Sequence, residues 1–393
     1  MQPITKLLPR CHKRVAAGRP WIYSNEIVMT DEVKALKPGT ITGVVSDAGE
    51  WVGQATINPH ALICGRIVTR DRDVVIDHEF LVARLGAALR LRERLFDEPY
   101  YRLANAEADG LPGIIIDRYG STVSIQLNTA GADCLKDDLF HAIENVLLPE
   151  TIVLRNDSEA RSLEGLDKYC SIAKGSLNQP VQLRENGTFF FADILQGQKT
   201  GWFYDQRMNR AFVASLASGA RLLDCYAHTG GFAIQAAVRG AVETIVVDTS
   251  VSALELASAA AQKNGVDKRV SIHKADVFLD LVSRANADER FDIVVADPPS
   301  FVKSKRDLKS GSRGYRKLAR LAAKVVAPGG VLFIASCSHN MSLDLFNEQM
   351  VRGVTDARRT GRILMKSGAS PDHPLHPGLP ESAYLKATTF QLD

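Results

Sequence analysis

The sequence predicts an α/β protein whose last part is a doubly wound, mostly parallel sheet, preceded by a β-rich segment and an α+β segment. Short strands bounded by turns fill the first 73 residues, and the segment that follows mixes strands with helices. From about residue 220, short apolar runs alternate with helical stretches. Continuously apolar strands separated by helices are typical of a parallel sheet covered on both faces.

The chain has 393 residues, which corresponds to two or three domains at about 150 residues each. We expect three, over residues 1–73, 74–185 and 186–393. Apolar residues make up 45% of the chain and charged residues 24%, which excludes collagen-like, disordered and disulfide-scaffold classes.

The six cysteines form no CxxC pair and no metal-ligand spacing, so we predict no metal site. The N-terminus lacks the apolar core of a signal peptide, and no stretch approaches a membrane span. These features predict a cytoplasmic protein with free thiols and no membrane association.

The first two segments can be assigned element by element. Residues 39–47 and 50–58 alternate around Asp47-Ala48-Gly49, which predicts a hairpin, and residues 61–69 form a further strand. Residues 78–95 have the apolar spacing of a helix. Two strands within 110–128, a helix over 132–147 and a strand over 150–157 complete the α+β segment.

The net charge of +3 conceals an uneven distribution. The segment 74–185 is acidic, whereas the first 19 residues contain five Lys or Arg and no acid. Residues 303–324 contain nine Lys or Arg and one acid, Asp307. Because distribution matters more than the sum, a polyanionic partner remains compatible with the composition.

Polar residues follow the ends of the predicted strands, where doubly wound sheets bind ligands. The first strand runs into Asp224-Cys225-Tyr226-Ala227-His228-Thr229-Gly230-Gly231, the second ends in Asp248 and the third in Asp276-Val277. An acid at the end of the second strand, where Asp248 lies, can accept hydrogen bonds from ribose hydroxyls. The pattern therefore indicates a nucleotide-type ligand. Without G-x-G-x-x-G or a Walker lysine, NAD(P) and ATP are disfavoured; the alternative is a structural turn with a surface acid.

The fourth strand ends in Asp297-Pro298-Pro299 and the fifth in Ser336-Cys337-Ser338. If these strands are neighbours, Asp297 and Cys337 share one cleft. A thiol there can act as a nucleophile when its surroundings lower its pKa. The alternative for Cys337 is a small buried apolar side chain.

With these motifs in place, the chain resembles the PUA-domain-containing class I S-adenosylmethionine (SAM)-dependent methyltransferases that make 5-methylcytidine in 23S ribosomal RNA. The resemblance covers nearly the whole chain. The segments that carry it are RPWIYSNEI, GLPGIIIDRYG, VLRNDSEARSLEGL, NGTFFFADILQGQKTGWFYDQR, LLDCYAHTGGF, VVDTS, KADVF, ADPPSF, ASCSHNM and SPDHPLHPGLPESAYLKATTF. It implies a PUA-like domain, a central domain and a Rossmann-like methyltransferase domain with a C-terminal antiparallel hairpin.

The resemblance also implies roles for matching residues. Cys337 is expected to be the catalytic nucleophile, with Asp297 its partner on the base, and Phe301 is expected to stack on a flipped base. The residues expected around SAM are Lys199, Phe203, Gln206, Tyr226, Thr229, Gly230, Asp248, Asp276, Val277 and Asp297.

The basic segment lies between the Asp297 and Cys337 motifs, so it is expected beside the cleft. SKRDLKSGSRG (304–314) is interpreted as a flexible loop that orders on RNA, with a solvated loop as the alternative. The cations expected to hold phosphates are Lys303, Lys305, Arg306, Lys309 and Arg313. The basic N-terminus with Trp21 and Tyr23 is a second RNA-contact candidate. The expected partner is 23S rRNA, naked or in an assembling large subunit, and a homodimer is one open oligomeric state.

The implied reaction is thiolate addition to C6 of cytosine, which activates C5 for methylation, with Asp297 at N3. The target base must be unstacked to be reached. His339 is one candidate for the base that removes the C5 proton. Two alternatives stay open: a methyltransferase acting on an exocyclic amine (guanine N2 or adenine N6), and a non-catalytic RNA-binding or ribosome-assembly factor.

Overall fold

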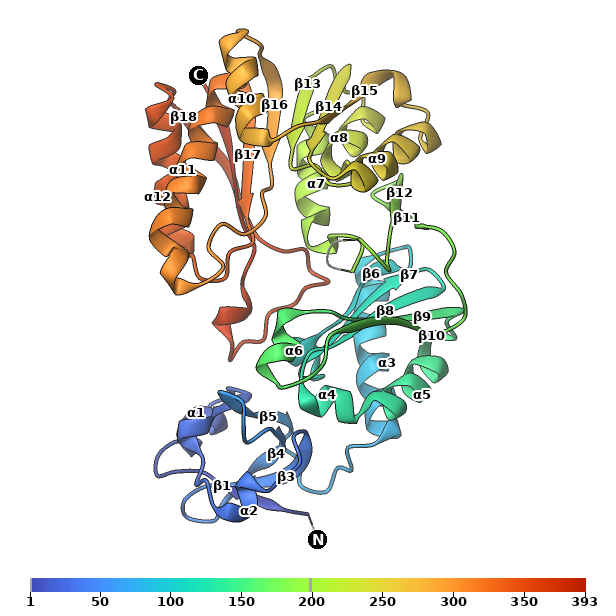
Figure 1. Ribbon diagram of the computed structural model, residues 1–393, viewed down its shortest axis with the longest axis vertical. Coiled ribbons are helices and arrows are strands. Elements are labelled where there is room, and N and C mark those ends of the chain that lie inside the picture. The colour runs from blue at the N-terminus through green and yellow to red at the C-terminus, as the bar shows by residue number, and fades with distance from the viewer. Residues whose placement is uncertain (1, 198–199) are drawn as a thin grey trace. The chain divides into compact units, whose positions relative to one another are not determined.

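The computed structural model describes residues 2–197 and 200–393 (Figure 1). The chain forms two compact units. The first unit comprises Met1–Val181, Asp193–Trp202 and Pro371–Pro380. The second unit comprises Gln182–Ala192, Phe203–Ser370 and Glu381–Asp393.

The first unit begins with a five-stranded sheet of order β1-β3-β4-β5-β2. Its strands and two short helices are β1 (Ile4–Lys6), α1 (His12–Ala16), β2 (Trp21–Tyr23), α2 (Asp31–Lys34), β3 (Thr40–Val45), β4 (Trp51–Ile57) and β5 (Ile63–Thr69). The antiparallel pairing of β3 with β4 confirms the hairpin predicted around Asp47. Apolar side chains such as Ile22, Val44 and Ile57 are fully buried and form a core of their own.

A second five-stranded sheet, of order β10-β9-β8-β7-β6, follows in the same unit. Its elements are α3 (His78–Leu95), β6 (Tyr100–Asn105), β7 (Ile114–Tyr119), β8 (Thr122–Leu127), α4 (Ala130–Cys134), α5 (Lys136–Leu147), β9 (Thr151–Asn156), α6 (Glu159–Leu163) and β10 (Tyr169–Lys174). The predicted helix over 78–95 is confirmed, and Asp77 caps it by accepting a hydrogen bond from the backbone N–H of Phe80. Leu81 and Leu85 of α3 are buried with Ile116 and Ile125 of the sheet.

The second unit contains a seven-stranded sheet of order β15-β14-β13-β16-β17-β19-β18. The strands are β13 (Arg221–Cys225), β14 (Glu243–Asp248), β15 (Val270–Lys274), β16 (Phe291–Ala296), β17 (Val326–Ser336), β18 (Gly361–Ser367) and β19 (Lys386–Leu392). The first five run parallel, and β19 pairs antiparallel with both β17 and β18. This arrangement confirms the predicted doubly wound sheet with a C-terminal antiparallel hairpin.

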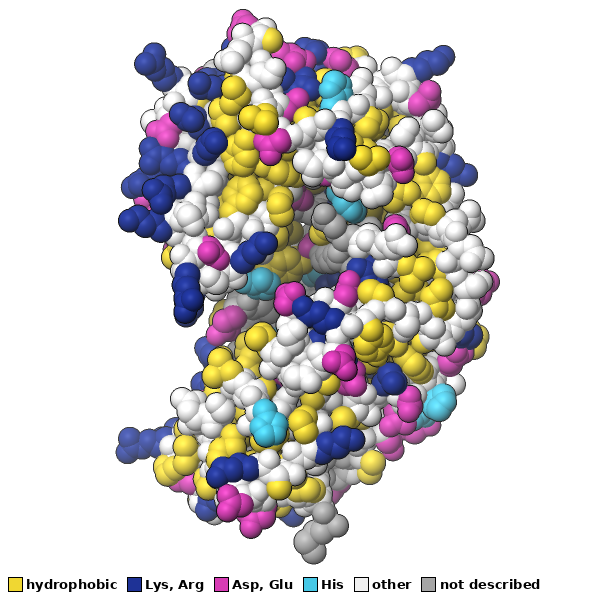
Figure 2. Space-filling view, viewed as in Figure 1, with side chains coloured by type: hydrophobic (Ala, Val, Ile, Leu, Met, Phe, Trp, Pro, Cys, Tyr) yellow, Lys and Arg dark blue, Asp and Glu magenta, His cyan; other side chains and the backbone are white. Residues whose placement is uncertain are grey.

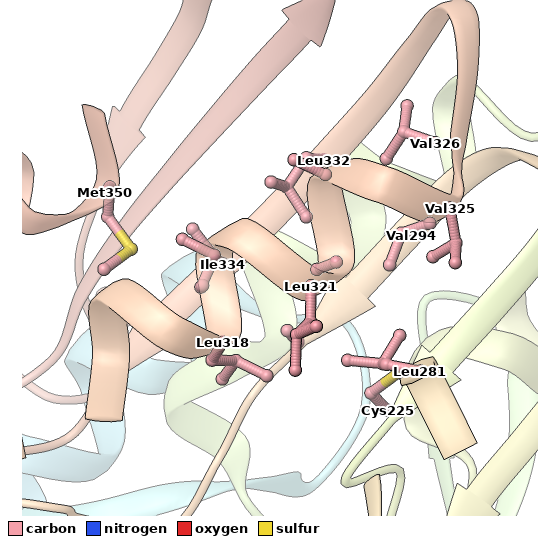
Figure 3. Packing of buried hydrophobic residues seen from close by; sticks show 14 of the residues in the cluster. Cys225, Leu281, Val294, Leu318, Leu321, Val325, Val326, Leu332, Ile334 and Met350 are labelled. Carbon is pink, nitrogen blue, oxygen red and sulfur yellow. The ribbon is translucent and has the colours of Figure 1, made fainter. Parts of the chain in front are cut away.

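Helices cover both faces of this sheet (Figure 1). They are α7 (Arg207–Ser215), α8 (Gly231–Val238), α9 (Val251–Lys263), α10 (Val277–Asn286), α11 (Leu308–Val325) and α12 (Leu343–Asp356). A small hairpin, β11 (Val181–Glu185) and β12 (Thr188–Ala192), packs through β12 on α9. Figure 3 shows Leu318 and Leu321 of α11 packed with Val294, Leu332 and Ile334 of the sheet.

The helix α11 corrects one prediction. Residues 304–314 are not a flexible loop, because Lys305–Asp307 form a 3-10 turn and α11 already begins at Leu308. Gly311 favours a loop when the sequence is taken locally, but it is buried within α11. A Cβ at Gly311 would lie 2.4 Å from the carbonyl oxygen of Phe301, so the glycine serves close packing of α11 against the loop after β16.

The three-domain division at residues 73 and 185 remains a prediction. The second unit already begins at residue 182, before the predicted boundary at 185. Residues 193–202 and 371–380, which the prediction places in the last domain, belong to the first unit. Within the described residues, no helix is long and apolar enough to cross a membrane.

Candidate functional site

Four polar side chains gather at one edge of the large sheet. β13 lies between β14 and β16, and β16 pairs in parallel with β17. The carboxyl ends of these strands therefore meet at the same edge. Asp224 is the second-last residue of β13 and Asp248 the last residue of β14, whereas Asp297 and Cys337 directly follow β16 and β17.

The turn from β13 into α8 has a constrained backbone. Tyr226, His228 and Gly230 all have positive φ angles, of 61°, 51° and 76°. Non-glycine residues rarely adopt this conformation, and it is concentrated at functional sites. A Cβ at Gly230 would lie 2.8 Å from Cδ1 of Ile234, so glycine is needed where α8 begins. The turn presents the N-terminus of a buried helix to the sheet edge.

Asp248 organises this turn through its carboxylate. One oxygen accepts a hydrogen bond from the backbone N–H of His228 at 2.8 Å, and the other accepts one from Ser250 at 2.9 Å. The His228 ring in turn meets the Phe203 ring edge-to-face, with centroids 5.3 Å apart. Burial lowers the pKa of His228. The structure thus joins Asp248, the β13–α8 turn and the Phe203 segment.

Asp224 is fully buried beneath the turn, and its Oδ2 accepts a hydrogen bond from the backbone N–H of Ala233 at 3.0 Å. Burial raises the pKa of Asp224 to about 8, and the charges of Asp297 and Asp248 act in the same direction. The carboxyl group is therefore largely protonated in the folded protein at neutral pH.

Asp224 should make the free protein less stable as pH rises. Between its unfolded pKa of about 3.9 and its folded pKa of about 8, only the folded state keeps the proton, so the free energy of unfolding falls with increasing pH. Asp224→Asn is expected to remove this part of the pH dependence. The urea midpoint of the variant minus that of the wild type should therefore increase from pH 5 to pH 8. The exposed Asp267→Asn is the matched control; parallel profiles for wild type and Asp224→Asn would contradict the assignment.

Asp276 and Val277 lie beyond the end of β15. Asp276 caps α10, where its Oδ1 accepts a hydrogen bond from the backbone N–H of Leu279 at 3.0 Å. Val277 is the buried first residue of that helix. Their expected contact with adenine remains a prediction, and the capping bond supplies a structural role for the Asp276 side chain.

The segment before α7 contacts the end of β16. The side-chain amide of Gln206 donates to the Asp297 carboxylate at 2.9 Å, and Gln206 is almost fully buried. The backbone N–H of Asp297 donates to the carbonyl of Cys225 at 3.3 Å. Asp297 is thereby held from two sides. The expected cofactor residue Lys199 lies outside the described residues.

Ser338 links the Cys337 loop to the Asp297 loop. Its hydroxyl lies 2.9 Å from the hydroxyl of Ser300 and 2.9 Å from that of Tyr315, and it accepts a hydrogen bond from the backbone N–H of Val302 at 3.3 Å. Ser338 is fully buried, whereas the neighbouring Cys337 keeps partial solvent access. The structure thus brings together the two loops that carry the predicted catalytic residues.

Phe301 is half-buried rather than fully exposed. Its ring packs on Tyr315, with centroids 4.7 Å apart, and also lies 6.2 Å from the ring of Phe278. The stacking of Phe301 on a flipped base therefore remains a prediction, and the geometry shows a ring already braced by two aromatic neighbours.

Cations cover the surface beside these loops. Figure 2 shows Lys and Arg side chains gathered at the left, over α11 and α12. The five predicted RNA-contact residues are all exposed, and none forms an ion pair among the described residues: Lys303, Lys305, Arg306, Lys309 and Arg313. Asp307, the acid in this run, is engaged by the backbone N–H and hydroxyl of Ser304.

Two side chains at the site were missed from the sequence. Tyr315 lies in the middle of α11, and Lys386 begins β19, far along the chain from Cys337. Both contact Ser338: Tyr315 through its hydroxyl and Lys386 through a hydrogen bond to the carbonyl at 2.8 Å. No local pattern marks Lys386, because its strand KATTFQL also contains Thr388, Thr389 and Gln391.

The residues at the sheet edge fit a SAM-type cofactor. Asp224 Oδ1 and Thr229 Oγ1 are buried and find no hydrogen-bond partner among the described residues. Asp224 lies at the end of β13 and Thr229 in the turn that leads into α8, and Asp248 offers carboxylate oxygens at the end of β14 beside them. At the carboxyl edge of a doubly wound sheet, these two side-chain oxygens are available to a polar ligand.

Comparison with known proteins agrees with this geometry. The family described as S-adenosylmethionine-dependent methyltransferase matches residues 163–390, and the PUA-like domain family matches residues 6–70. Ribosomal RNA large subunit methyltransferase I of Shewanella denitrificans is 36% identical over 388 residues, 97% of each chain. The protein of the same name from Erwinia tasmaniensis is 35% identical over 379 residues, 95% of each chain.

A solved methyltransferase structure, complexed with S-adenosylhomocysteine, has the same fold. It matches all of both chains with a TM-score of 0.84 at 21% identity. The matched motifs, the sheet order and the near-complete coverage lead to one conclusion. The chain belongs to the family of PUA-domain-containing SAM-dependent methyltransferases that includes ribosomal RNA large subunit methyltransferase I.

Proposed function

We propose that this protein methylates C5 of a cytosine in 23S rRNA through a covalent bond between Cys337 and C6 of the base. The observation that supports this proposal most strongly is the Ser338 hydroxyl, which joins the loop of Cys337 to the loop that follows Asp297. An acid and a partly accessible thiol on joined loops beside a methyltransferase cofactor edge suit this reaction. Because the proposed substrate is ribosomal RNA, we expect the protein to act in the cytoplasm.

The cytosine ring needs activation because C5 is a weak nucleophile on its own. The Cys337 thiolate adds to C6, and the electrons of the C5–C6 double bond become available at C5. Asp297, oriented by Gln206, gives a hydrogen bond or its carboxyl proton to N3 as negative charge develops there. When bound, SAM would supply the electrophilic methyl group for C5, with S-adenosylhomocysteine as the leaving group. A base then removes the C5 proton; the electron pair restores the double bond and expels the thiolate. His339 follows Ser338 and is a candidate for this base.

The identity of the modified nucleotide tests the proposal directly. The purified protein is incubated with SAM and 23S rRNA, either naked or in large-subunit precursors, and the nucleosides are separated by mass spectrometry. We expect 5-methylcytidine. N2-methylguanosine or N6-methyladenosine would instead establish the exocyclic-amine alternative, and failure to bind SAM by calorimetry would support a non-catalytic assembly factor.

The basic start of α11 should contribute phosphate contacts. Lys309→Gln/Arg313→Gln is expected to weaken rRNA binding and to reduce the slope of log K against log salt by about 1–2, because each lost phosphate contact removes about 0.7–0.9 of slope. Filter binding between 50 and 200 mM salt measures this slope. The rate at saturating RNA should change little.

A matched control is available at the opposite edge of the sheet. Lys268 and Arg269 are exposed and precede β15, so Lys268→Gln/Arg269→Gln removes the same charge far from the site. This variant should leave the salt slope nearly unchanged. Equal slopes for both double variants would show that the α11 cations act only through net charge.

A further inference from the structure

Lys386 is a buried cation at the edge of the site. It is the first residue of β19 and only 6% of its surface is exposed. β19 pairs antiparallel with β17, and Lys386 lies directly opposite Ser336, the residue before Cys337. Pairing in the sheet therefore places the lysine beside the point where β17 turns into the Cys337 loop.

The lysine ammonium binds two neutral groups. Nζ donates to the carbonyl of Ser338 at 2.8 Å and to the carbonyl of Tyr384 at 2.8 Å. None of the carboxylates that the structure describes forms an ion pair with it. An ammonium has three N–H donors, and a buried charge without a counter-charge is costly. The observed bonds account for two donors and leave the charge uncompensated.

Cys337 is the group that can compensate this charge. Burial lowers the pKa of Lys386, whereas interaction with Cys337 raises it again. The geometry agrees with this, because Nζ bonds to the carbonyl of Ser338 on one side of Cys337 and Lys386 pairs with Ser336 on the other. A thiolate beside the ammonium would supply the counter-charge that the described carboxylates do not.

Other titratable groups face the same loop. His339 has its pKa lowered by partial burial and by the charge of Lys386, and its ring lies 5.2 Å from the ring of Tyr384. The Tyr384 hydroxyl donates to Asp205. Tyr315, whose hydroxyl contacts Ser338, has its pKa raised by burial and stays neutral. Asp297 follows the adjacent strand β16, so among these groups Lys386 is the one suited to stabilise a thiolate.

We propose that Lys386 is a positioning residue for Cys337: its ammonium stabilises the thiolate, and its two hydrogen bonds hold the loop that carries the sulfur. The thiol proton passes to solvent, which leaves a thiolate–ammonium pair. The positioning role of Lys386 rests on the proposed function in one respect: the Cys337 thiolate is taken to be the nucleophile. The charge pairing itself requires neither RNA nor SAM.

The pH dependence of Cys337 alkylation tests this pairing in the full-length protein. Iodoacetamide reacts with the thiolate, and peptide mass spectrometry resolves Cys337 from the other cysteines, with the exposed Cys134 as an internal reference. For Lys386→Met we expect alkylation at pH 7 to be about tenfold slower and the profile to shift to higher pH. Lys386→Arg, which keeps the charge, should restore most of the rate.

Two further variants separate the charge from packing. Lys386→Gln keeps an amide donor for the carbonyls without the charge, and its profile should shift as that of Lys386→Met does even if the latter folds poorly. Lys366→Met removes an exposed lysine from the neighbouring strand β18 and should leave the profile unchanged. Wild-type profiles for both Lys386→Gln and Lys386→Met would overturn the proposal.

The outcome is distinguishable from failure of the proposed function. If Cys337→Ala retains full methylation, the nucleophile role is wrong, yet the alkylation profile still reports whether Lys386 stabilises the thiolate. If Cys337→Ala is inactive and the profile does not respond to Lys386, the covalent mechanism stands and the positioning role is refuted.

Discussion

Replacement of the Cys337 thiol by Cys337→Ala is expected to lower the single-turnover rate of methyl transfer to rRNA by at least about 10³-fold. Without thiolate addition at C6, cytosine C5 has too little electron density to take the methyl group. SAM binding should persist, because the Asp248 contacts and the β13–α8 turn lie on other strands of the sheet. Rapid-quench methylation with radiolabelled SAM, together with calorimetry, measures the two properties separately.

A control variant and a mechanism-based trap test the same role of Cys337. Cys134→Ala removes an exposed thiol from α4 and should leave the rate unchanged. RNA carrying 5-fluorocytosine at the target should accumulate a covalent adduct with the wild type, because fluorine at C5 blocks the final proton removal. Cys337→Ser should form no such adduct. Full activity of Cys337→Ala would refute the covalent mechanism and favour transfer to an exocyclic amine.

The architecture of the large sheet could be predicted from local patterns. β16 is apolar except for Asp292, and β14 contains the apolar run Ile245–Val247, as expected for strands buried on both faces; each strand is followed by a helix. The position of Asp248 and Asp297 at strand ends follows directly. Local apolar spacing was also sufficient for α3, whose Asp77 cap and first apolar turn agree with one another.

Features that depend on distant contacts could not be predicted. Gly311 and Ser312 suggest a loop when read locally, yet they are buried in α11 because the helix packs tightly on the Phe301 backbone. The segment 371–380 joins the first unit because the Asp372 carboxylate accepts a hydrogen bond from the backbone N–H of Arg102, which lies 270 residues earlier. Lys386 escaped notice for the same reason, since its role depends on pairing between β17 and β19.

Substitution of Asp297 is expected to have the second largest effect. Asp297→Asn should lower kcat by about 10²–10⁴-fold, a larger effect than its effect on SAM binding or on the RNA KM. Asparagine keeps an oxygen that can accept the hydrogen bond from Gln206, so the loop after β16 should retain its geometry. What the variant loses is the carboxyl proton that N3 takes up as the thiolate adds to C6.

The adduct assay identifies the step at which Asp297 acts. If Asp297 assists addition to C6, Asp297→Asn should form the 5-fluorocytosine adduct as slowly as it methylates, although Cys337 is intact. Gln206→Met removes the donor to Asp297 while keeping the carboxylate, so it should produce a smaller loss in the same step. If the variant forms the adduct at the normal rate but methylates slowly, Asp297 acts after the addition to C6. A fully active Asp297→Asn would show that Asp297 has no catalytic role. Its function would then be the hydrogen bond with Gln206, which an uncharged amide can also form.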